Sequence, residues 1–284
     1  MLALEKIKAS CNEKTTDTKK SALTAYLFDQ ISSTMDLASA IQQGQEILEP
    51  HQSIELNVPA HELQGLTAVL ARGQTQGRGR QGRSWTSTEN QGLYATVCWN
   101  PQAKLNTLPG LSIVVGLALQ QALKSFNLKV SLKWPNDLVV FEENQTQLVW
   151  KKLGGILIES TLNAEVCSSM RLGFGINLQP VEIAPPAQPI SLSELGFYQQ
   201  QACDENILFV TCLFEIIENL NLLLNTGFAP FQERFMRDSN LCGKKLSRNH
   251  KVYLVEGIDS QGALIVNDPQ TQEKSLLHSG EIEL

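Results

Sequence analysis

Residues 77–83 combine three arginines with three glycines in seven consecutive positions. Arginine presents a planar set of N–H donors that pairs with phosphate or carboxylate oxygens in bidentate fashion. Glycine lets the backbone approach a ligand closely and turn its N–H groups toward that ligand. The whole chain carries a formal net charge of −6, so this arginine–glycine loop is a local basic feature. It predicts a focused site for a small anion.

The loop differs from two common nucleotide-binding turns. It lacks the Gly-Lys-Ser/Thr ending of a P-loop, and a strand rather than a helix is predicted to follow it. No third glycine opens a helix at the spacing that a Rossmann turn needs. Two alternatives remain at this point: an exposed loop that binds nothing, and a loop that binds RNA through its backbone phosphates.

Three further segments follow the loop in order. They read Lys-Trp-Pro-Asn-Asp-Leu at 133–138, Lys-Leu-Gly-Gly-Ile-Leu-Ile-Glu at 152–159 and Gly-Phe-Gly-Ile-Asn at 173–177. Together with Gln74, the loop and Trp85, they closely resemble the motifs of the biotin protein ligase family, and the resemblance covers about residues 26–284. It implies an α/β (α+β) fold, in which a mixed-sheet catalytic domain of the biotin/lipoate ligase type is followed by a C-terminal SH3-like β-barrel.

The resemblance also implies an ATP-dependent reaction in two steps. Biotin and ATP give biotinyl-5′-AMP and pyrophosphate, and a specific lysine of a biotin carboxyl carrier domain then attacks the mixed anhydride. The expected ligands are therefore ATP, Mg²⁺ and biotin, and the expected partner is the carrier domain of acetyl-CoA carboxylase or of another carboxylase.

Two other functions stay open as alternatives. Lipoate and octanoyl transfer enzymes share the catalytic fold, but they usually lack the arginine–glycine loop. A non-catalytic RNA-binding module is disfavoured, because the chain is acidic and the loop arginines are not interleaved with aromatic residues.

The family motifs place biotin binding at seven residues: Ser33, Thr34, Gln74, Arg78, Gly79, Arg80 and Lys152. The arginines would clamp the phosphate and fold the loop over the intermediate, and Lys152 would polarise the biotin carboxylate and later the acyl-adenylate carbonyl. Lys152 and Arg80 are the catalytic candidates. Ser33 and Thr34 match positions that bind the ureido group, although either could equally be a helix cap. Met35 stands where relatives often have asparagine, which removes one polar contact.

The motifs place nucleotide binding at five residues: Arg83, Trp85, Asn136, Asp137 and Asn177. Arg83 could instead brace the loop, and Trp85 could anchor it rather than stack on adenine. Asn136 and Asp137 resemble the nucleotide and magnesium region of the family, so Mg²⁺ is expected near Asp137; a local Asx turn would also explain the pair. Asn177 is similar to the adenine contact of the family, and an unpaired asparagine at a strand end is the alternative.

Composition excludes several classes of protein. The chain is 42% hydrophobic and 18% charged, which is typical of globular proteins. Six cysteines without a Cys-x-x-Cys pair, and four distant histidines, disfavour a zinc site or a disulfide framework and indicate a reducing, cytoplasmic location. Charges interrupt the first ten residues, so no signal peptide is expected. The most apolar long stretch, 207–224, contains Glu215 and Glu218, so no membrane span is expected.

Three units are expected along the chain. Residues 1–24 form a lead-in segment that is either mobile or a short packed arm, residues 25–237 form the catalytic domain, and residues 238–284 form the SH3-like domain. Repressors of the same family carry an N-terminal winged helix-turn-helix of about 60 residues. Only about 25 residues precede the first motif here, so we expect a monofunctional ligase without DNA binding. Both a monomer and a homodimer fit the sequence.

Capping residues and apolar spacing predict the elements that position these motifs. Helices are expected over 33–43, over 108–126 with Pro109 in the first turn, and from Asp204 to near Gly227. Strands are expected over 66–71, 93–99, 130–134, 137–141, 153–159 and 170–178, and over 252–255, 263–266 and 274–277 in the C-terminal unit. A hairpin loop at 142–147 and a proline-rich connection at 180–189 complete the expected outline.

Overall fold

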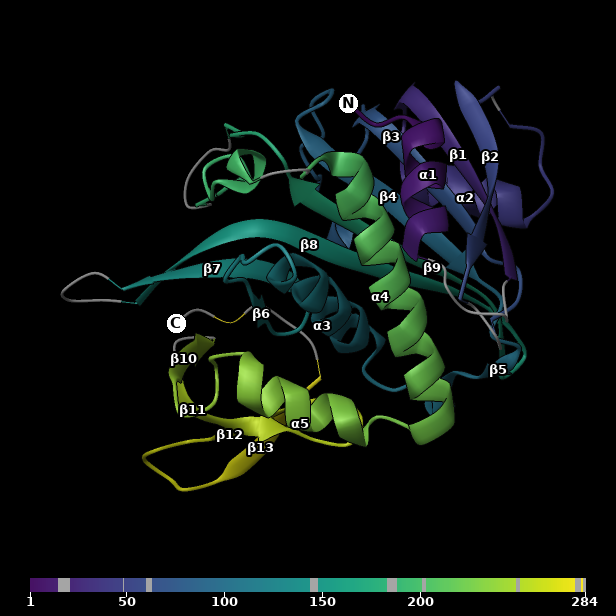
Figure 1. Cartoon of the computed structure of the whole chain (residues 1–284). Helices are drawn as coiled ribbons and strands as arrows, with labels where there is room; N and C mark the ends of the chain where they lie inside the picture. The colour runs from purple at the N-terminus through teal and green to yellow at the C-terminus, as the bar shows by residue number, and fades with distance from the viewer. Residues whose placement is uncertain are drawn as a thin grey trace.

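The computed structural model describes residues 1–14, 21–47, 49–59, 63–143, 148–182, 188–200, 203–248, 251–278 and 282. These residues form a large mixed sheet with helices on both faces and a smaller sheet near the C-terminus (Figure 1). The expected α/β (α+β) class with a large mixed sheet is confirmed.

The large sheet contains nine strands. Eight follow the order β2-β1-β3-β4-β9-β8-β7-β6, and β5 pairs with β9. The pair β1–β3 is parallel, and the other pairs are antiparallel. The strands are β1 Ser21–Ile31, β2 Gln52–Val58, β3 Thr67–Gln74, β4 Gly92–Trp99, β5 Ala103–Lys104, β6 Ser131–Lys133, β7 Asp137–Glu143, β8 Leu148–Asn163 and β9 Val166–Asn177.

Helices α1 (Leu4–Lys14), α3 (Leu111–Lys124) and α4 (Glu205–Thr226) cover one face of this sheet and enclose the main core (Figure 1). Helix α2 (Thr34–Gln42) covers the other face, where a smaller apolar cluster lies beneath it. By length and composition α4 could cross a membrane, but most of it is buried against α3 and α1. It is therefore packed as a core helix is packed.

Near its centre, the α2 face of the sheet carries glycines and therefore no side chains. Along β9, Leu172 and Phe174 point into the main core, so Gly173 and Gly175 lie on the α2 face, because side chains alternate between the two faces of a strand. Gly155 on β8 pairs with Gly175 in the sheet register. The absence of side chains at these positions leaves room on the sheet surface for other groups.

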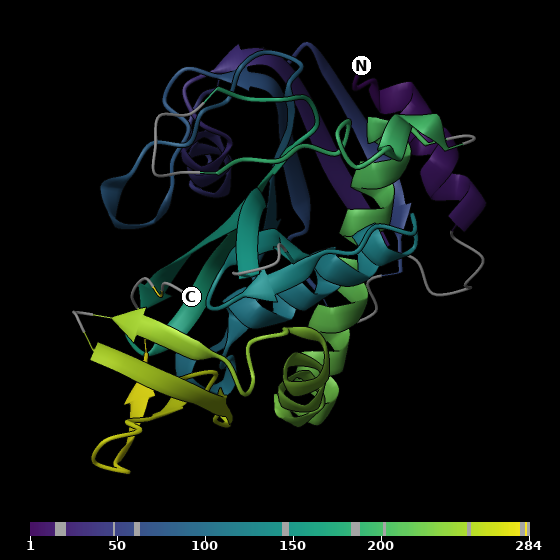
Figure 2. The ribbon, with the colours of Figure 1, turned by 90° about the vertical axis from the view of Figure 1, so that its left-hand side faces the viewer.

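The C-terminal unit begins after α5 (Ala229–Asp238). Its four antiparallel strands follow the order β10-β11-β12-β13 and are β10 Lys245–Arg248, β11 Lys251–Ile258, β12 Leu264–Asn267 and β13 Lys274–Leu277. Both views place this sheet at the end of the molecule opposite α1 and β2 (Figure 2). The sheet is consistent with the expected SH3-like domain, but its described strands do not close into a barrel.

The predicted helix caps are confirmed. The Ser33 hydroxyl accepts a hydrogen bond from the Met35 N–H at 3.2 Å, and the Asp204 carboxylate caps α4. The helix predicted over 108–126 was too long, because Gly110 adopts a left-handed φ of 60° and α3 starts after it. Pro109 therefore precedes the helix instead of occupying its first turn.

Several elements were not predicted. Within the expected lead-in segment, α1 buries Leu4, Ile7 and Cys11, which matches a packed arm, and β1 already begins at Ser21. Strands β2 and β10 and helix α5 were missed as well. Residues 144–147 of the predicted hairpin loop and 183–187 of the proline-rich connection lie outside the described residues.

Candidate active site

A pocket opens on the α2 face of the sheet. The start of α2, the arginine–glycine loop, the turn between β6 and β7, and strands β8 and β9 line it. Of the predicted site residues, all but Asn177 lie in its wall: Ser33, Thr34, Gln74, Arg78, Gly79, Arg80, Arg83, Trp85, Asn136, Asp137 and Lys152. The fold thus gathers residues from distant parts of the chain around one cavity.

One end of the pocket is a buried polar cluster. The Gln74 side-chain oxygen accepts hydrogen bonds from the Thr34 backbone N–H at 2.8 Å and from the Thr34 hydroxyl at 3.2 Å. The Gln74 amide donates to the Ser87 hydroxyl at 2.8 Å, and the Thr96 hydroxyl donates to Thr34 at 2.9 Å. The cluster fixes the orientation of the Gln74 amide. Ser87 and Thr96 were not predicted, because neither belongs to a recognised motif.

Lys152 and Asp137 form the centre of the other end. The Lys152 ammonium lies 2.8 Å from the Asp137 carboxylate across the β7–β8 pair. The backbone of Lys152 is fixed on its outer side, because its N–H donates to Gln188 O at 2.7 Å and its carbonyl accepts from Ile190 N at 3.0 Å. Both side chains remain partly open to solvent, so an anion or a cation entering the pocket can replace either partner.

Trp85 lies flat on the bare part of the sheet. A Cβ atom at Gly175 would lie 2.7 Å from the Trp85 Nε1, and one at Gly155 would lie 3.1 Å from the ring. The paired glycines are therefore required by the position of the indole. The ring centroid is 5.3 Å from the Lys152 ammonium, and the buried indole N–H has no hydrogen-bond partner among the described residues. The indole thus offers both an aromatic surface and an unused donor at the pocket wall.

The arginine–glycine loop folds back on itself over the pocket. Its tip is a tight turn at Gln81 and Gly82, whose φ values of 56° and 73° are both left-handed. The Gly79 N–H donates to Arg83 O at 2.7 Å and closes the turn. The Arg80 guanidinium reaches across to the Asn136 side-chain oxygen at 2.8 Å, which ties the loop to the β6–β7 turn. The Arg83 side chain donates to Gln81 Oε1 at 3.1 Å, as the bracing role predicts.

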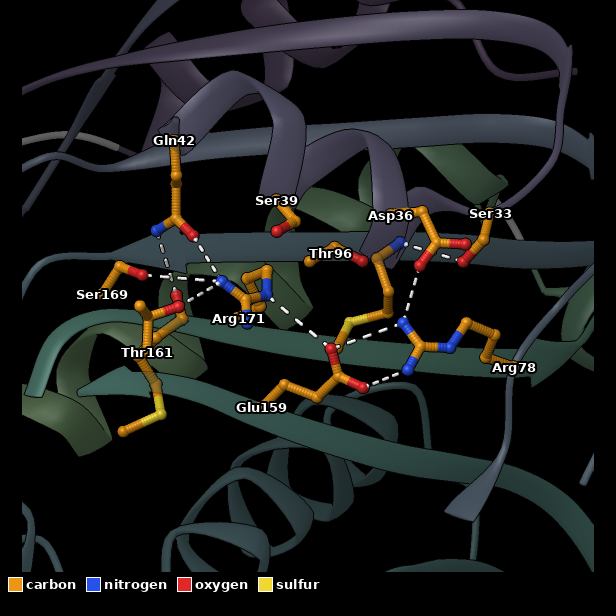
Figure 3. Close-up of polar contacts among 12 residues, drawn as sticks. Ser33, Asp36, Ser39, Gln42, Arg78, Thr96, Glu159, Thr161, Ser169 and Arg171 are labelled. Atoms are coloured by element: carbon orange, nitrogen blue, oxygen red, sulfur yellow. Dashed lines mark hydrogen bonds and ion pairs between the residues drawn. The ribbon is translucent and has the colours of Figure 1, made fainter. Parts of the chain in front are cut away.

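Arg78 is bound by two carboxylates rather than facing an open anion site. Its guanidinium donates to Asp36 Oδ1 at 2.6 Å and also contacts Glu159 (Figure 3). Burial disfavours the charged form of Arg78, but these carboxylates outweigh burial and raise the pKa of the guanidinium. The phosphate contact of Arg78 stays a prediction, and these two carboxylates are the partners that the structure shows.

Comparison with known proteins identifies the family. Residues 43–177 match the biotin/lipoate A/B protein ligase family. The sequence is 32% identical to the bifunctional ligase/repressor BirA of Escherichia coli over 213 residues, which are 72% of this chain and 63% of that protein. Residues 43–177 thus form a domain of the biotin/lipoate A/B protein ligase family. The biotin–[acetyl-CoA-carboxylase] ligase of Paracoccus denitrificans is 29% identical over 219 residues, with 73% of this chain and 86% of that protein covered.

The solved structures agree with the family assignment. The biotin protein ligase from Aquifex aeolicus in complex with biotin and ATP superposes with a TM-score of 0.66 at 25% identity, covering 91% of this chain and 97% of that chain. The matches to the BirA proteins of Escherichia coli and Salmonella typhimurium each cover 63% of the relative's length. The chain thus shares part of those longer proteins.

Asn177 is the last residue of β9. It is buried outside the pocket wall, and its amide donates to Ile190 O at 3.1 Å and to Lys152 O at 3.3 Å. It is therefore not an unpaired strand-end residue, and its predicted contact with adenine stays a prediction. Asn177 ties the end of β9 to Lys152.

Proposed function

We propose that this protein is an ATP-dependent biotin protein ligase. It would form biotinyl-5′-AMP and pyrophosphate from biotin and ATP, and then transfer biotin to a lysine of a biotin carboxyl carrier domain. The observation that carries the proposal is one pocket with a neutral polar cluster at one end and Lys152, Arg80 and Asp137 at the other. The names of the relatives, which include biotin–[acetyl-CoA-carboxylase] ligase, support it.

The polar cluster suits the ureido end of biotin. The Ser33 hydroxyl accepts the N–H of Met35, so its own proton can be donated to the ureido carbonyl. Thr34 and Gln74 are held in place by their mutual hydrogen bonds. The Thr34 hydroxyl has one lone pair left to accept from a ureido N–H, and the second N–H of the Gln74 amide can donate to the ureido carbonyl. A buried site that hydrogen-bonds a polar group rejects analogues that lack the group.

The cationic end suits the first chemical step. A carboxylate oxygen of biotin attacks the α-phosphorus of ATP, a P–O bond forms, and the bond to the departing pyrophosphate breaks. Both reactants are anions, so the site must neutralise them and hold them in line. Lys152 would pair with the carboxylate as it now pairs with Asp137, and Arg80 would bind the α-phosphate from the loop.

Asp137 is the candidate for holding the metal of MgATP. It is the one carboxylate among the described residues that line the pocket, and Mg²⁺ is commonly held by one or two carboxylates together with substrate phosphates. When bound, the metal would neutralise charge on the phosphates. Release of Lys152 toward biotin would leave the Asp137 oxygens available for it.

The second step needs an amine from outside. The lysine nitrogen of the carrier domain attacks the carbonyl of the mixed anhydride, an amide bond forms, and AMP leaves. We propose the carrier domain of acetyl-CoA carboxylase or of another carboxylase as the acceptor. Lys152, beside this carbonyl, would stabilise the negative charge that develops on its oxygen.

Exchange of labelled pyrophosphate into ATP tests the proposal. We expect exchange only when biotin is supplied, and no exchange with lipoate or octanoate at the same concentration. A second assay follows labelled biotin into a carrier domain, with and without ATP. Exchange that depends on lipoate or octanoate instead of biotin would reassign the enzyme within its family.

A further inference from the structure

Four charged side chains of alternating sign form a row from the pocket rim into the protein. They are Asp36 at the start of α2, Arg78 in the loop, Glu159 on β8 and Arg171 on β9 (Figure 3). Their charges cancel. Of the four, Arg78 lines the pocket, so the other three can act on a ligand only through it.

The inner end of this row is rigidly held. Arg171 is 6% exposed, and its Nη1 donates to Gln42 Oε1 and to the Thr161 hydroxyl, both at 3.1 Å. Its Nε lies 3.8 Å from the Glu159 carboxylate and makes no hydrogen bond within the part of the chain that the structure describes. A buried cation stays charged when a carboxylate lies close by, so Arg171 fixes the Glu159 side chain in one place.

The outer end of the row holds the loop. Both terminal nitrogens of Arg78 are engaged, Nη1 by Asp36 and Nη2 by Glu159. Arg80, in contrast, contacts the neutral side chain of Asn136. Two arginines that are two positions apart in sequence therefore have different partners: Arg78 is neutralised by the protein, and Arg80 keeps its charge for a ligand.

We propose that Glu159 is a positioning residue that, together with Asp36, holds the arginine–glycine loop closed through Arg78. The latch consists of Asp36, Arg78 and Glu159, and Arg171 anchors it. Its role in the reaction rests on the proposed function: a closed loop would retain the acyl-adenylate until the carrier lysine arrives. Arg80 and Lys152 bind the anions, and the latch keeps Arg80 above them.

Hydrogen exchange of the loop amides at 76–84 in ligand-free protein tests the latch. Glu159→Gln should raise the exchange rate about fivefold, as expected for a partly exposed ion pair. Arg78→Gln should have a similar effect, and the double variant should exchange no faster than either single variant. Glu165→Gln is the matched control, because Glu165 is an exposed glutamate between β8 and β9 that pairs with Lys104. Unchanged exchange in Glu159→Gln, or additive effects in the double variant, would overturn the proposal.

A milder variant covers the case in which Glu159→Gln folds poorly. Thr161→Val removes one hydrogen bond from Arg171 and keeps the shape of the side chain. Its loop amides should exchange about twofold faster, while the amides of β4 keep the rate of the wild type. If the loop amides of Thr161→Val exchange at the wild-type rate, Arg171 does not anchor the latch.

A functional measurement separates this inference from the proposed function. With Glu159→Gln, pyrophosphate exchange at saturating substrates should stay within twofold of wild type, while preformed biotinyl-5′-AMP should leave about fivefold faster. A general structural defect would lower both rates instead. If wild-type protein shows no biotin-dependent exchange, the proposed function fails, while the loop measurement still decides the latch. Unchanged release of the adenylate from Glu159→Gln would show that the latch does not retain the intermediate.

Discussion

The surroundings of single charged residues decide which of them can do chemistry. Lys152 is paired with Asp137 at 2.8 Å, beside the Trp85 ring and in the wall of the pocket. Its neighbour Lys151 does not line the pocket. Two adjacent lysines with the same charge thus provide a matched pair for testing the electrostatic role.

Lys152→Met should lower the rate of biotin-dependent pyrophosphate exchange by about 100-fold to 1,000-fold. Loss of one preorganised electrostatic group in an active site has an effect of this size. Initial rates at saturating ATP and biotin measure the change. Lys151→Met is the control and should keep at least half of the wild-type rate. Equal losses in both variants would refute a specific role for Lys152.

Arg80→Gln should let the activated intermediate escape. The variant removes a charge-assisted hydrogen-bond donor worth about 1.5–3 kcal/mol, which corresponds to roughly 10-fold to 150-fold faster dissociation. Rapid dilution of protein loaded with labelled biotinyl-5′-AMP measures the release. Arg83→Gln, which changes an arginine that braces Gln81, should have a smaller effect. Unchanged release from Arg80→Gln would show that other groups retain the adenylate.

At the scale of secondary-structure elements, strands β8 and β9 carry glycines against which the Trp85 indole packs. In Gly175→Ala the new methyl group would meet the indole at 2.7 Å, so the ring must move. Overpacking of this kind costs about 1–3 kcal/mol. Urea denaturation should show a lower free energy of unfolding, and ATP binding should weaken. The double variant Gly175→Ala/Trp85→Phe has a smaller, single ring at position 85 and should therefore recover part of the free energy of unfolding. No recovery would mean that the clash lies elsewhere.

The arginine–glycine loop is expected to become more rigid when both substrates bind. Three glycines and little apolar content allow the loop to open in the absence of a ligand, despite the latch and the Arg80–Asn136 hydrogen bond. Hydrogen exchange at 76–83 should therefore slow when biotin and MgATP are added, while β4 should not change. Biotin alone and MgATP alone are the controls. An exchange rate that is the same in all four samples would contradict the prediction.

Elements with local signals could be predicted from the sequence, and those that depend on distant partners could not. Ser33 and Asp204 predicted the starts of α2 and α4, because an N-cap side chain accepts a hydrogen bond from a backbone N–H within three residues. Helix α1 has few apolar residues and is stabilised by packing on α4 and β2, which no local pattern reveals. The apolar alternation of β1 is visible in hindsight at Leu23, Ala25 and Leu27.

The same distinction applies to the site. The family motifs identified the pocket lining, since they carry recognisable residue types in order. The partners of Arg78 were missed because they lie 42 and 81 positions away in sequence. Asp36 looked like part of a helix start, and Glu159 was the last letter of a motif with no assigned role. Asp36 and Glu159 come close to Arg78 only because the strands pair as they do and α2 packs on the sheet.

At the scale of the whole molecule, ligand binding should raise thermal stability. A ligand present at 100 times its Kd adds about 2.7 kcal/mol to the free energy of unfolding. For a chain of this size, that corresponds to an increase in Tm of roughly 5 °C. Differential scanning fluorimetry with biotin and MgATP should show it, and RNA should give no shift. Stabilisation by RNA alone would favour the binding-module alternative.

The C-terminal sheet is connected directly to the pocket. The Trp134 indole, next to Asn136 and Asp137 in sequence, donates to Gly262 O at 3.0 Å across 128 positions, and Ile282 lies in the pocket wall. Residues that flank the strands of the C-terminal unit therefore reach the pocket: Ile282 lines it, and Gly262 holds Trp134, which also lines it. Substitutions in the turn at 259–262 would therefore shift Trp134 and, with it, the neighbouring Asn136 and Asp137, although the turn itself lies outside the pocket wall.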